Sequence, residues 1–183
     1  MKFAYADPPY LGCGKLYPEH PNARDWDKKG RHHLLVEQLC DEYPDGWAMS
    51  LSAPSLITIL PMCPTDTLVA AWSRPNSVPF YPVRVIKSWE PVLYRGGRST
   101  FKKGNGDCVR DILTAPFIAN GLIGAKPRKF CRWVFGLLGA TKGDTLDDLF
   151  PGSGAVAAAW AEWVGEQSPL PQLPLEALAC PVC

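Results

Sequence analysis

Short apolar segments alternate with helical stretches along this chain, and the alternation limits it to an α/β fold. Helices are expected at residues 32–43, 52–60 and 126–138, and strands at residues 2–6, 47–51 and 67–72. This rhythm favours right-handed βαβ crossovers and a mainly parallel sheet. At 183 residues the chain fits one domain, predicted over residues 1–167 and followed by a Pro-rich tail at 168–183.

The first predicted strand runs into the tetrapeptide Asp7-Pro8-Pro9-Tyr10. Ligands of open α/β sheets bind at the carboxyl ends of the strands, so this loop stands where a site is expected. The two prolines stiffen it, because both have a fixed φ and Pro9 keeps Pro8 extended. The Asp7 carboxylate and the loop carbonyls can accept hydrogen bonds, and the Tyr10 ring can stack on a flat group. The loop therefore suits a planar ligand that carries an NH2, although a plain connecting loop is the simpler alternative.

A second candidate loop lies near the other end of the sequence. Residues 145–150 have the length of a strand and lead into Pro151-Gly152-Ser153-Gly154, after which an alanine-rich helix starts at Ala155. A strand, a glycine turn and a helix N-terminus bring backbone close to a ligand and aim free N–H groups at it. Alone, such a turn is a weak signal.

Together the two loops resemble the motifs of the amino-methyltransferases that use S-adenosylmethionine. Asp7-Pro8-Pro9-Tyr10 is similar to their Asp-Pro-Pro-Tyr signature, and the turn resembles their Asp-Pro-Phe-x-Gly-Ser-Gly cofactor loop. The matching residues of the second loop are Asp148, Phe150, Gly152, Ser153 and Gly154, with Leu149 in place of the usual proline. Because the catalytic loop precedes the cofactor loop, the order resembles the circularly permuted β-class of DNA amino-methyltransferases.

The resemblance implies a Rossmann-like sheet with an antiparallel edge, S-adenosylmethionine as cofactor and DNA as partner. Asp7, Pro8, Pro9 and Tyr10 would be the catalytic residues. The Asp7 carboxylate and the Pro8 carbonyl would accept the two N–H bonds of an exocyclic amine, and Tyr10 would stack on a base flipped out of the duplex. Aspartate rather than serine at position 7 favours adenine over cytosine. Lys126 and Pro127, just upstream of the glycine loop, would line the cofactor pocket.

Residues 95–106 are basic and rich in glycine, and in the family the target-recognising insertion falls at this place. We expect residues 95–125 to form a short insertion beside the site that contacts the target. The predicted nucleic-acid contacts are Arg95, Arg98, Lys102 and Lys103. The alternative is a solvated glycine-rich loop.

Two further segments bear on the resemblance. Trp89-Glu90-Pro91 is similar to a segment of related methyltransferases, and its proline favours an edge strand or a strand start. Relatives also continue past the glycine-loop helix into a strand that ends in a ribose-binding acid. Residues 168–174 are instead rich in proline, which predicts a sheet without the strands after that helix. An edge left open there would be covered by the tail or by a second subunit, so we predict a homodimer.

Residues 11–31 form a polar segment broken by glycine and proline, which is either a lid over Asp7 or a solvated surface loop. The two histidines that follow, His32 and His33, are expected to be solvated and not catalytic.

Composition excludes several other classes of function. A net charge of +1 gives no global attraction to nucleic acid, so binding must rest on local patches. No secretory segment and no bilayer-spanning run is visible, which predicts a cytoplasmic protein without membrane contact. Seven scattered cysteines fit reduced thiols, and Cys180-x-x-Cys183 is half a zinc site at most, so no metal is expected.

The sequence thus predicts an enzyme, a DNA adenine N6-methyltransferase. Two alternatives stay open. One is a methyltransferase of the cytosine amine, of RNA or of a free nucleotide; the other is a non-catalytic relative that binds nucleic acid or protein. The missing ribose acid favours the second alternative, and the complete Asp7 loop opposes it.

Overall fold

The first strand, β1 (Lys2–Ala6), lies inside a six-stranded sheet with the order β5-β3-β4-β2-β1-β6. The computed structural model describes residues 1–17, 22–79, 82–99, 108–117 and 125–166. The other strands are β2 (Gly46–Ser50), β3 (Leu68–Ser73), β4 (Trp89–Gly96), β5 (Ile112–Thr114) and β6 (Thr145–Asp148). The helices are α1 (Lys29–Glu42), α2 (Leu56–Ile59), α3 (Arg128–Leu137) and α4 (Ala155–Glu166), with short 3-10 turns η1 (Gly14–Leu16), η2 (Ala23–Asp27), η3 (Ala53–Ser55) and η4 (Leu60–Met62).

Every strand except β4 runs in the same direction. β1 pairs in parallel with β2 and β6, and β3 pairs in parallel with β5, while β4 is antiparallel to both β2 and β3. The predicted mainly parallel sheet is confirmed. The carboxyl ends of the parallel strands and the start of β4 therefore share one edge of the sheet, which is the edge where Asp7 follows β1.

The antiparallel strand is internal, so the expectation of an antiparallel edge is wrong. β4 lies between β3 and β2, and Pro91 stands opposite Ala71 of β3. The Pro91 carbonyl accepts from the backbone N–H of Leu51 (3.2 Å), the residue that follows the end of β2. The proline is tolerated because it sits near the strand start, where the ladder with β2 is already ending.

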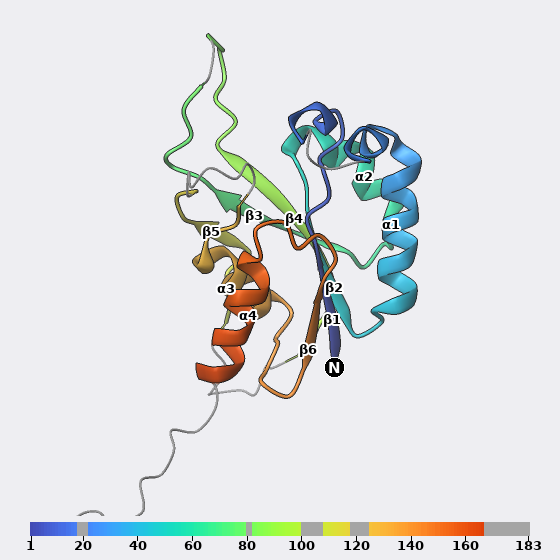
Figure 1. The fold of residues 1–183 in the computed structure, drawn as a ribbon, viewed down its shortest axis with the longest axis vertical. Coiled ribbons are helices and arrows are strands. Elements are labelled where there is room, and N and C mark those ends of the chain that lie inside the picture. Colours follow the sequence, from blue (N-terminus) through green and yellow to red (C-terminus); the bar gives the residue numbers. More distant parts are fainter. Residues whose placement is uncertain (18–21, 80–81, 100–107, 118–124, 167–183) are drawn as a thin grey trace, which may run out of the picture.

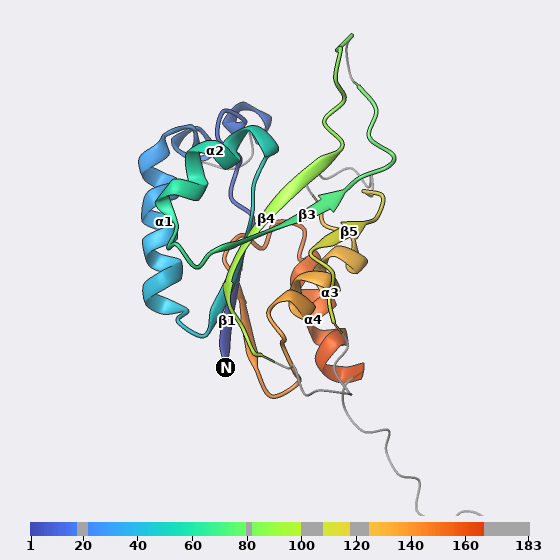
Figure 2. The same ribbon diagram turned by 180° about the vertical axis from the view of Figure 1, so that it is seen from behind.

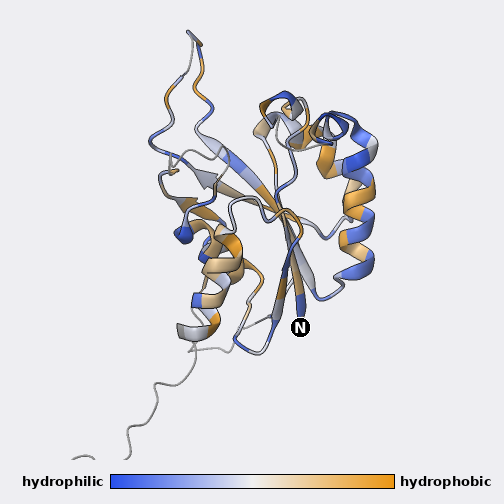
Figure 3. Ribbon diagram, in the orientation of Figure 1, coloured by the Kyte–Doolittle hydropathy of each residue, from blue (hydrophilic) through white to orange (hydrophobic). Residues whose placement is uncertain are grey.

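Helices cover both faces of the sheet (Figures 1 and 2). One apolar cluster joins the sheet to α3 and α4, and it includes Phe3, Tyr5 and Phe130. A second cluster joins the opposite face to α1 and α2. Figure 3 shows hydrophobic colour along the middle of the sheet and on parts of each helix. Successive side chains of a strand point to opposite faces, so β1, buried from Phe3 to Ala6, supplies both clusters.

Local sequence signals mark the boundaries of α3 and the breaks in the helix expected at residues 52–60. α3 starts directly after Pro127, and Gly139 follows its last turn with φ +60. A Cβ at Gly139 would come within 2.6 Å of the Arg98 carbonyl oxygen, so this position needs glycine for space as well as for φ. The helix expected at residues 52–60 is divided into η3, α2 and η4, with prolines in the first turns of η3 and η4.

The expectation that both histidines are solvated is wrong for His32. Its side chain is buried near the start of α1, with Nε2 2.9 Å from the Trp26 carbonyl oxygen. Burial lowers the pKa of His32, because the charged imidazolium would lose its hydration. His33 is exposed beside Glu37 and has no such role.

No helix in the described part of the chain is long and apolar enough to cross a membrane. The described cysteines, Cys13, Cys40, Cys63, Cys108 and Cys131, are free thiols. Within the same residues no group of His, Cys, Asp and Glu side chains is arranged to hold a metal ion. The predicted tail at 168–183, with Cys180 and Cys183, lies outside the described residues.

Candidate active site

The two candidate loops end neighbouring parallel strands. Tyr5 of β1 stands opposite Asp148 of β6, and the backbone N–H of Leu149 donates to the Tyr5 carbonyl (3.0 Å). Asp7 comes directly after the last residue of β1, and the glycine turn follows β6 at the same edge. Segments far apart in the sequence therefore meet at the end of the sheet where a ligand is expected.

Asp7 forms an ion pair with Lys126, which precedes α3. Lys126 Nζ lies 3.0 Å from Asp7 Oδ1, and its side chain is only 5% exposed. The same ammonium lies 3.4 Å from Glu90 Oε2 of β4 and donates to the Tyr10 hydroxyl at 2.9 Å. One buried cation thus serves two carboxylates, of Asp7 and Glu90. The sequence predicted Lys126 as a cofactor contact, and the structure places its ammonium beside Asp7.

Glu90 is itself held on its other oxygen. Arg74, the residue after β3, donates from Nη1 to Glu90 Oε1 (2.6 Å). The Tyr10 hydroxyl lies 2.9 Å from Glu90 Oε2 and 3.2 Å from Asp7 Oδ1, so the phenol bridges the two acids. Cations and carboxylates are therefore matched in number within this cluster of Asp7, Glu90, Arg74 and Lys126, which lets it remain charged while buried.

Lys126 is the main group that favours an ionised Asp7. Burial raises the pKa of Asp7, Lys126 opposes that rise without cancelling it, and the charge of Glu90 adds to it. Burial also works against the charge of Lys126, but Asp7 and Glu90 outweigh it and raise the pKa of the ammonium. Lys126 therefore stays protonated and supplies the nearest positive charge to the carboxylate at the strand end.

The predicted ring face of Tyr10 is half-buried, and Lys126 Nζ lies 5.4 Å from the ring centroid. Burial raises the pKa of the Tyr10 phenol well above its usual value, and the charges of Asp7 and Glu90 add to the rise. Pro8 and Pro9 are both buried, so the loop is as fixed as its sequence suggests.

The glycine turn has the backbone that its sequence requires. Gly152 and Gly154 have φ +43 and +73, and α4 begins directly after Gly154 at Ala155. A Cβ at Gly154 would meet nothing within 4 Å, so this glycine is required by its conformation and leaves open space beside it. Ser153 is exposed at the turn between them.

Asp148 offers a free acceptor next to this turn. Its Oδ1 accepts from the backbone N–H of Phe150 (3.2 Å), whereas Oδ2 is buried without a hydrogen-bond partner among the described residues. Burial raises the pKa of Asp148, the Phe150 N–H opposes the rise, and the charge of Asp7 adds to it. A buried acceptor without a donor suits a ligand that brings an amine or a hydroxyl. These residues therefore fit a cofactor of the S-adenosylmethionine kind.

The described parts of the segment at 11–31, residues 11–17 and 22–31, come close to both loops. The Trp26 ring packs edge-on against Phe150 with centroids 5.1 Å apart. Burial, and next the charge of Asp7, raise the pKa of the Tyr17 phenol to about 12. The segment is therefore packed beside the site, and its closing over Asp7 stays a prediction.

Arg95 and Arg98 lie at the other end of the sheet. The strand register places Arg95 opposite Trp47, near the start of β2, whereas Asp7 follows the end of β1. Arg95 Nε pairs with Asp66 Oδ1 (2.7 Å), and Arg98 holds Asp144 with both terminal nitrogens (2.7 and 2.8 Å). The expectation that this stretch starts beside the site is not met. Lys102 and Lys103 lie outside the described residues.

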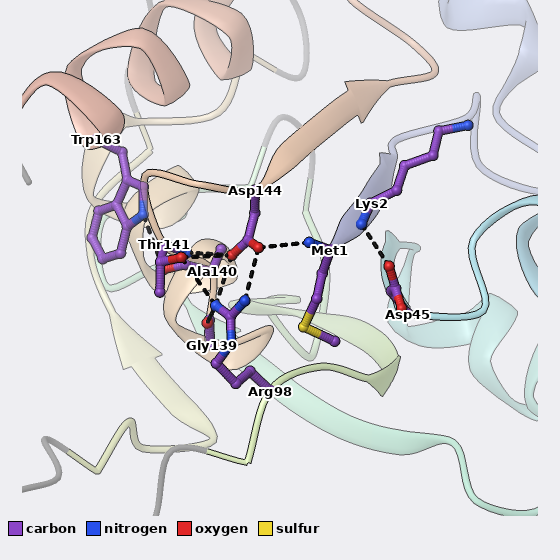
Figure 4. A network of polar contacts seen from close by, with 9 residues as sticks. All are labelled: Met1, Lys2, Asp45, Arg98, Gly139, Ala140, Thr141, Asp144 and Trp163. Atoms are coloured by element: carbon purple, nitrogen blue, oxygen red, sulfur yellow. Dashed lines mark hydrogen bonds and ion pairs between the residues drawn. The ribbon is translucent and has the colours of Figure 1, made fainter.

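Asp144 is the centre of the network shown in Figure 4. It also accepts from the amino group of Met1 (2.8 Å) and from the backbone N–H of Thr141 (2.7 Å). These contacts tie the start of β1 to the start of β6 and use the charge of Arg98. Their evident role is structural.

Sequence reasoning missed that Glu90, Arg74 and Lys126 form one charged cluster with Asp7. A glutamate directly before the apolar run Pro91-Val92-Leu93 was the available signal, since a buried carboxylate needs a cation nearby. Its partners come from segments distant in the sequence, so no local pattern named them.

No family model matches the sequence, and no curated protein matches it. Solved structures resemble the fold at low identity. M1.HpyAVI in complex with SAM has a TM-score of 0.59 and 14% identity, covering 89% of this chain and 78% of that one. TTHA0409 from Thermus thermophilus, which its description assigns provisionally to the DNA modification methylases, has a TM-score of 0.53 and 17% identity over 89% and 77% of the chains. A second M1.HpyAVI structure has a TM-score of 0.51 and 18% identity over 88% and 76%. The chain therefore shares its α/β fold with M1.HpyAVI and TTHA0409.

Proposed function

We propose that this protein transfers a methyl group from S-adenosylmethionine to the exocyclic amine of adenine in DNA. The observation that carries the proposal is the meeting of Asp7-Pro8-Pro9-Tyr10 and the glycine turn at the ends of β1 and β6. A rigid acceptor loop beside a ligand-binding turn is what methyl transfer to an amine requires, because the reaction depends on positioning.

Asp7 has an oxygen left for the substrate. Both of its contacts with the described residues, to Lys126 and Tyr10, are made by Oδ1. Oδ2 and the Pro8 carbonyl would accept the two N–H bonds of the amine. Its nitrogen would then become more tetrahedral and direct its lone pair toward the methyl donor. Lys126 opposes the rise in the pKa of Asp7 and so favours the carboxylate, which is the stronger acceptor.

The cofactor would lie along the glycine turn. When bound, S-adenosylmethionine supplies an electrophilic methyl group. The backbone of Gly152, Ser153 and Gly154 would follow it closely, Phe150 would pack against it, and Asp148 Oδ2 would accept from one of its polar groups. Pro127 lies buried next to Lys126, so a pocket-lining role of the Lys126-Pro127 pair remains part of the proposal.

Three finer points belong to the same proposal. Aspartate at position 7 favours adenine over cytosine as the target. The position of the catalytic loop before the glycine turn fits a circularly permuted methyltransferase. DNA as substrate is supported by the likeness to TTHA0409, and a homodimer by the position of β6 at the edge of the described sheet.

The test is transfer of labelled methyl from S-adenosylmethionine to unmethylated DNA, followed by digestion to nucleosides. Label in methylated adenine is expected. Asp7→Ala should lower the rate at least about a hundredfold, which is typical for loss of one oriented hydrogen-bonding group, and it should retain cofactor binding. Asp41→Ala is the matched control, since Asp41 is exposed on α1.

Other outcomes would change the proposal. Label in cytosine would keep the mechanism and change the target. Transfer by Asp7→Ala at the normal rate would refute the role of the loop. No transfer to DNA, RNA or nucleotides, together with no cofactor binding, would leave a protein that acts by binding alone.

A further inference from the structure

The connection between β3 and β4, residues 74–88, extends beyond the rest of the molecule as a long arm (Figures 1 and 2). Of these residues the structure describes 74–79 and 82–88. β3 ends and β4 begins at the edge of the sheet that carries Asp7, because β4 alone runs antiparallel. The arm therefore projects from the same edge as the candidate active site.

The base of the arm is fixed to that site. Arg74 donates its backbone N–H to the Ser88 carbonyl (2.7 Å) and its Nη2 to the Lys87 carbonyl (3.3 Å). Its Nη1 reaches Glu90, the partner of Lys126. Asn76 exchanges two hydrogen bonds with the backbone of Phe117, each of 3.0 Å. The arm is thus anchored on two sides where it leaves the sheet.

The surface of the arm combines exposed apolar side chains with cations. Val78, Val83, Val85 and Ile86 are 68%, 43%, 66% and 46% exposed. Arg84 and Lys87 are exposed between and beside them, and no carboxylate of the described residues pairs with either. The sequence from 74 to 88 contains no Asp or Glu. Branched apolar side chains displayed in this number on a projecting segment mark a contact surface.

We propose that this arm is the element that grips duplex DNA, with Arg84 and Lys87 on the phosphates and the exposed valines against the bases. The proposal rests on the proposed function. It moves the expected DNA contact from Arg95 and Arg98 to the described parts of the arm, residues 74–79 and 82–88. Cations without acidic neighbours complement a polyanion. Apolar side chains inserted between base steps are a known way to unstack a duplex.

The reaction gives such a wedge a purpose. A base in a duplex must leave the stack before its exocyclic amine can reach Asp7, and unstacking costs free energy. An apolar element anchored at the site would offset part of that cost. A surface for a second protein copy would not need the unpaired cations, so DNA is the occupant that uses both features of the arm.

The cations are tested by binding alone, without methyl transfer. Affinity of a fluorescein-labelled duplex of mixed sequence is measured by anisotropy over a range of salt concentrations. The slope of log K against log salt is negative, and each lost phosphate contact makes it less steep by about 0.9. Arg84→Gln combined with Lys87→Gln should therefore make it less steep by about 2. Arg84→Gln and Lys87→Gln made singly should each give about half of this change. Lys142→Gln neutralises an exposed lysine just before β6, so it is the matched control for these single variants and should leave the slope unchanged.

The valines are tested by comparing two substrates. Val78→Ser with Val85→Ser should slow methyl transfer to duplex DNA by about tenfold or more and leave transfer to the same sequence as a single strand nearly unchanged. A single strand needs no base pair to be opened, which is why it should be spared. Ile57→Ser is the control, because Ile57 is 83% exposed on α2.

Failure of the arm and failure of the proposed function are distinguishable. If wild-type protein methylates DNA and the Arg84 and Lys87 variants keep its salt slope, the arm does not hold phosphates and the inference is wrong. If the valine variant loses methyl transfer equally on duplex and single-stranded DNA, the valines do not help to open the duplex. If sedimentation shows that the wild-type protein is a dimer and that Val78→Ser with Val85→Ser is a monomer, the arm serves self-association instead of DNA binding. If no substrate is methylated, the proposed function fails. The salt slopes of wild-type protein and of the Arg84 and Lys87 variants would still show whether these two cations hold phosphates.

Discussion

Replacement of Lys126 by methionine should remove the positive charge that opposes the rise in the pKa of Asp7. Methionine is close to lysine in shape and unbranched, so the buried side chain can still fill its place while the ammonium is lost. Asp7 and Glu90 would then face each other without a common cation, since Arg74 serves only the far oxygen of Glu90. The pKa of Asp7, already raised by burial, should rise further.

The magnitude follows from the contacts. At 3.0 and 3.4 Å, and with an effective dielectric constant of about 20, each pair attracts by about 5 kcal/mol. Desolvation of the ammonium offsets several kcal/mol of this, and removal of one partner of a buried pair costs about 3–5 kcal/mol. The three side chains are 5%, 19% and 13% exposed, so solvent does little to reduce the figure. Uptake of a proton by one carboxyl would limit the loss at low pH.

The sign of the pH dependence follows from the pKa shifts. In wild type the pKa of Lys126 is raised, so its contribution to stability is present at neutral pH and is lost only as the pH rises above the ordinary value of 10.5. In Lys126→Met a folded-state carboxyl with a raised pKa binds more protons than the unfolded chain. The variant should therefore become relatively more stable as the pH falls.

The assay is methyl transfer measured against pH, with urea unfolding at the same pH values. In Lys126→Met the acid limb of the rate profile should move to higher pH, because less of Asp7 is ionised. At a pH below the limb, the rate should fall about tenfold whenever the pKa of Asp7 rises by one. Lys126→Arg keeps the charge and should restore the limb. Lys129→Met, an exposed lysine on α3, is the matched control. A loss of stability without any movement of the limb would refute the claim that Lys126 sets the ionisation of Asp7.

Two further predictions concern the ends of β6. Hydrogen bonds from Arg98 hold the pKa of Asp144 well below its ordinary 3.8. Asp144→Asn should therefore lower the free energy of unfolding in urea by roughly 2–3 kcal/mol at neutral pH. The difference from wild type should shrink as the pH falls below 3.8. Equal differences at all pH values would show that Asp144 acts by shape and not by charge. Gly154→Ala should cost about 1–2 kcal/mol through its positive φ and weaken S-adenosylmethionine binding in calorimetric titration. Gly143→Ala, which meets open space without such a φ, should do neither, and identical behaviour of the two variants would exclude a special role of the turn.

The sequence predicted those parts of the fold that depend on local chemistry. The strand before Asp7, the glycine turn after β6, and the helix between Pro127 and Gly139 carry their own start and stop signals, and all three are confirmed. The meeting of the two loops is a finding of the structure, and it agrees with the predicted parallel sheet, in which carboxyl ends of strands share one edge.

Strand order and charge pairing could not be predicted in this way. Nothing in the residues of β4 distinguishes an internal antiparallel strand from an edge strand, since its neighbours are set by the packing of the whole sheet. The partners of Lys126 and Arg98 come from elements far along the chain. The basic stretch at residues 95–106 was expected beside the site from its composition and from the family resemblance. The direction of β4 decides at which end of the sheet that stretch begins.

The pairing of the first strand with the last described one has a kinetic consequence. Contacts such as that between the Met1 amine and Asp144 span 143 residues, and closing so long a loop is slow because its entropy is lost before the contact is gained. The loop at Asp7 and the glycine turn are not brought together until β6 pairs with β1. Recovery of cofactor binding during refolding would therefore lag behind the burial of the tryptophans packed around α1 and β2, and would time the final closure of the sheet.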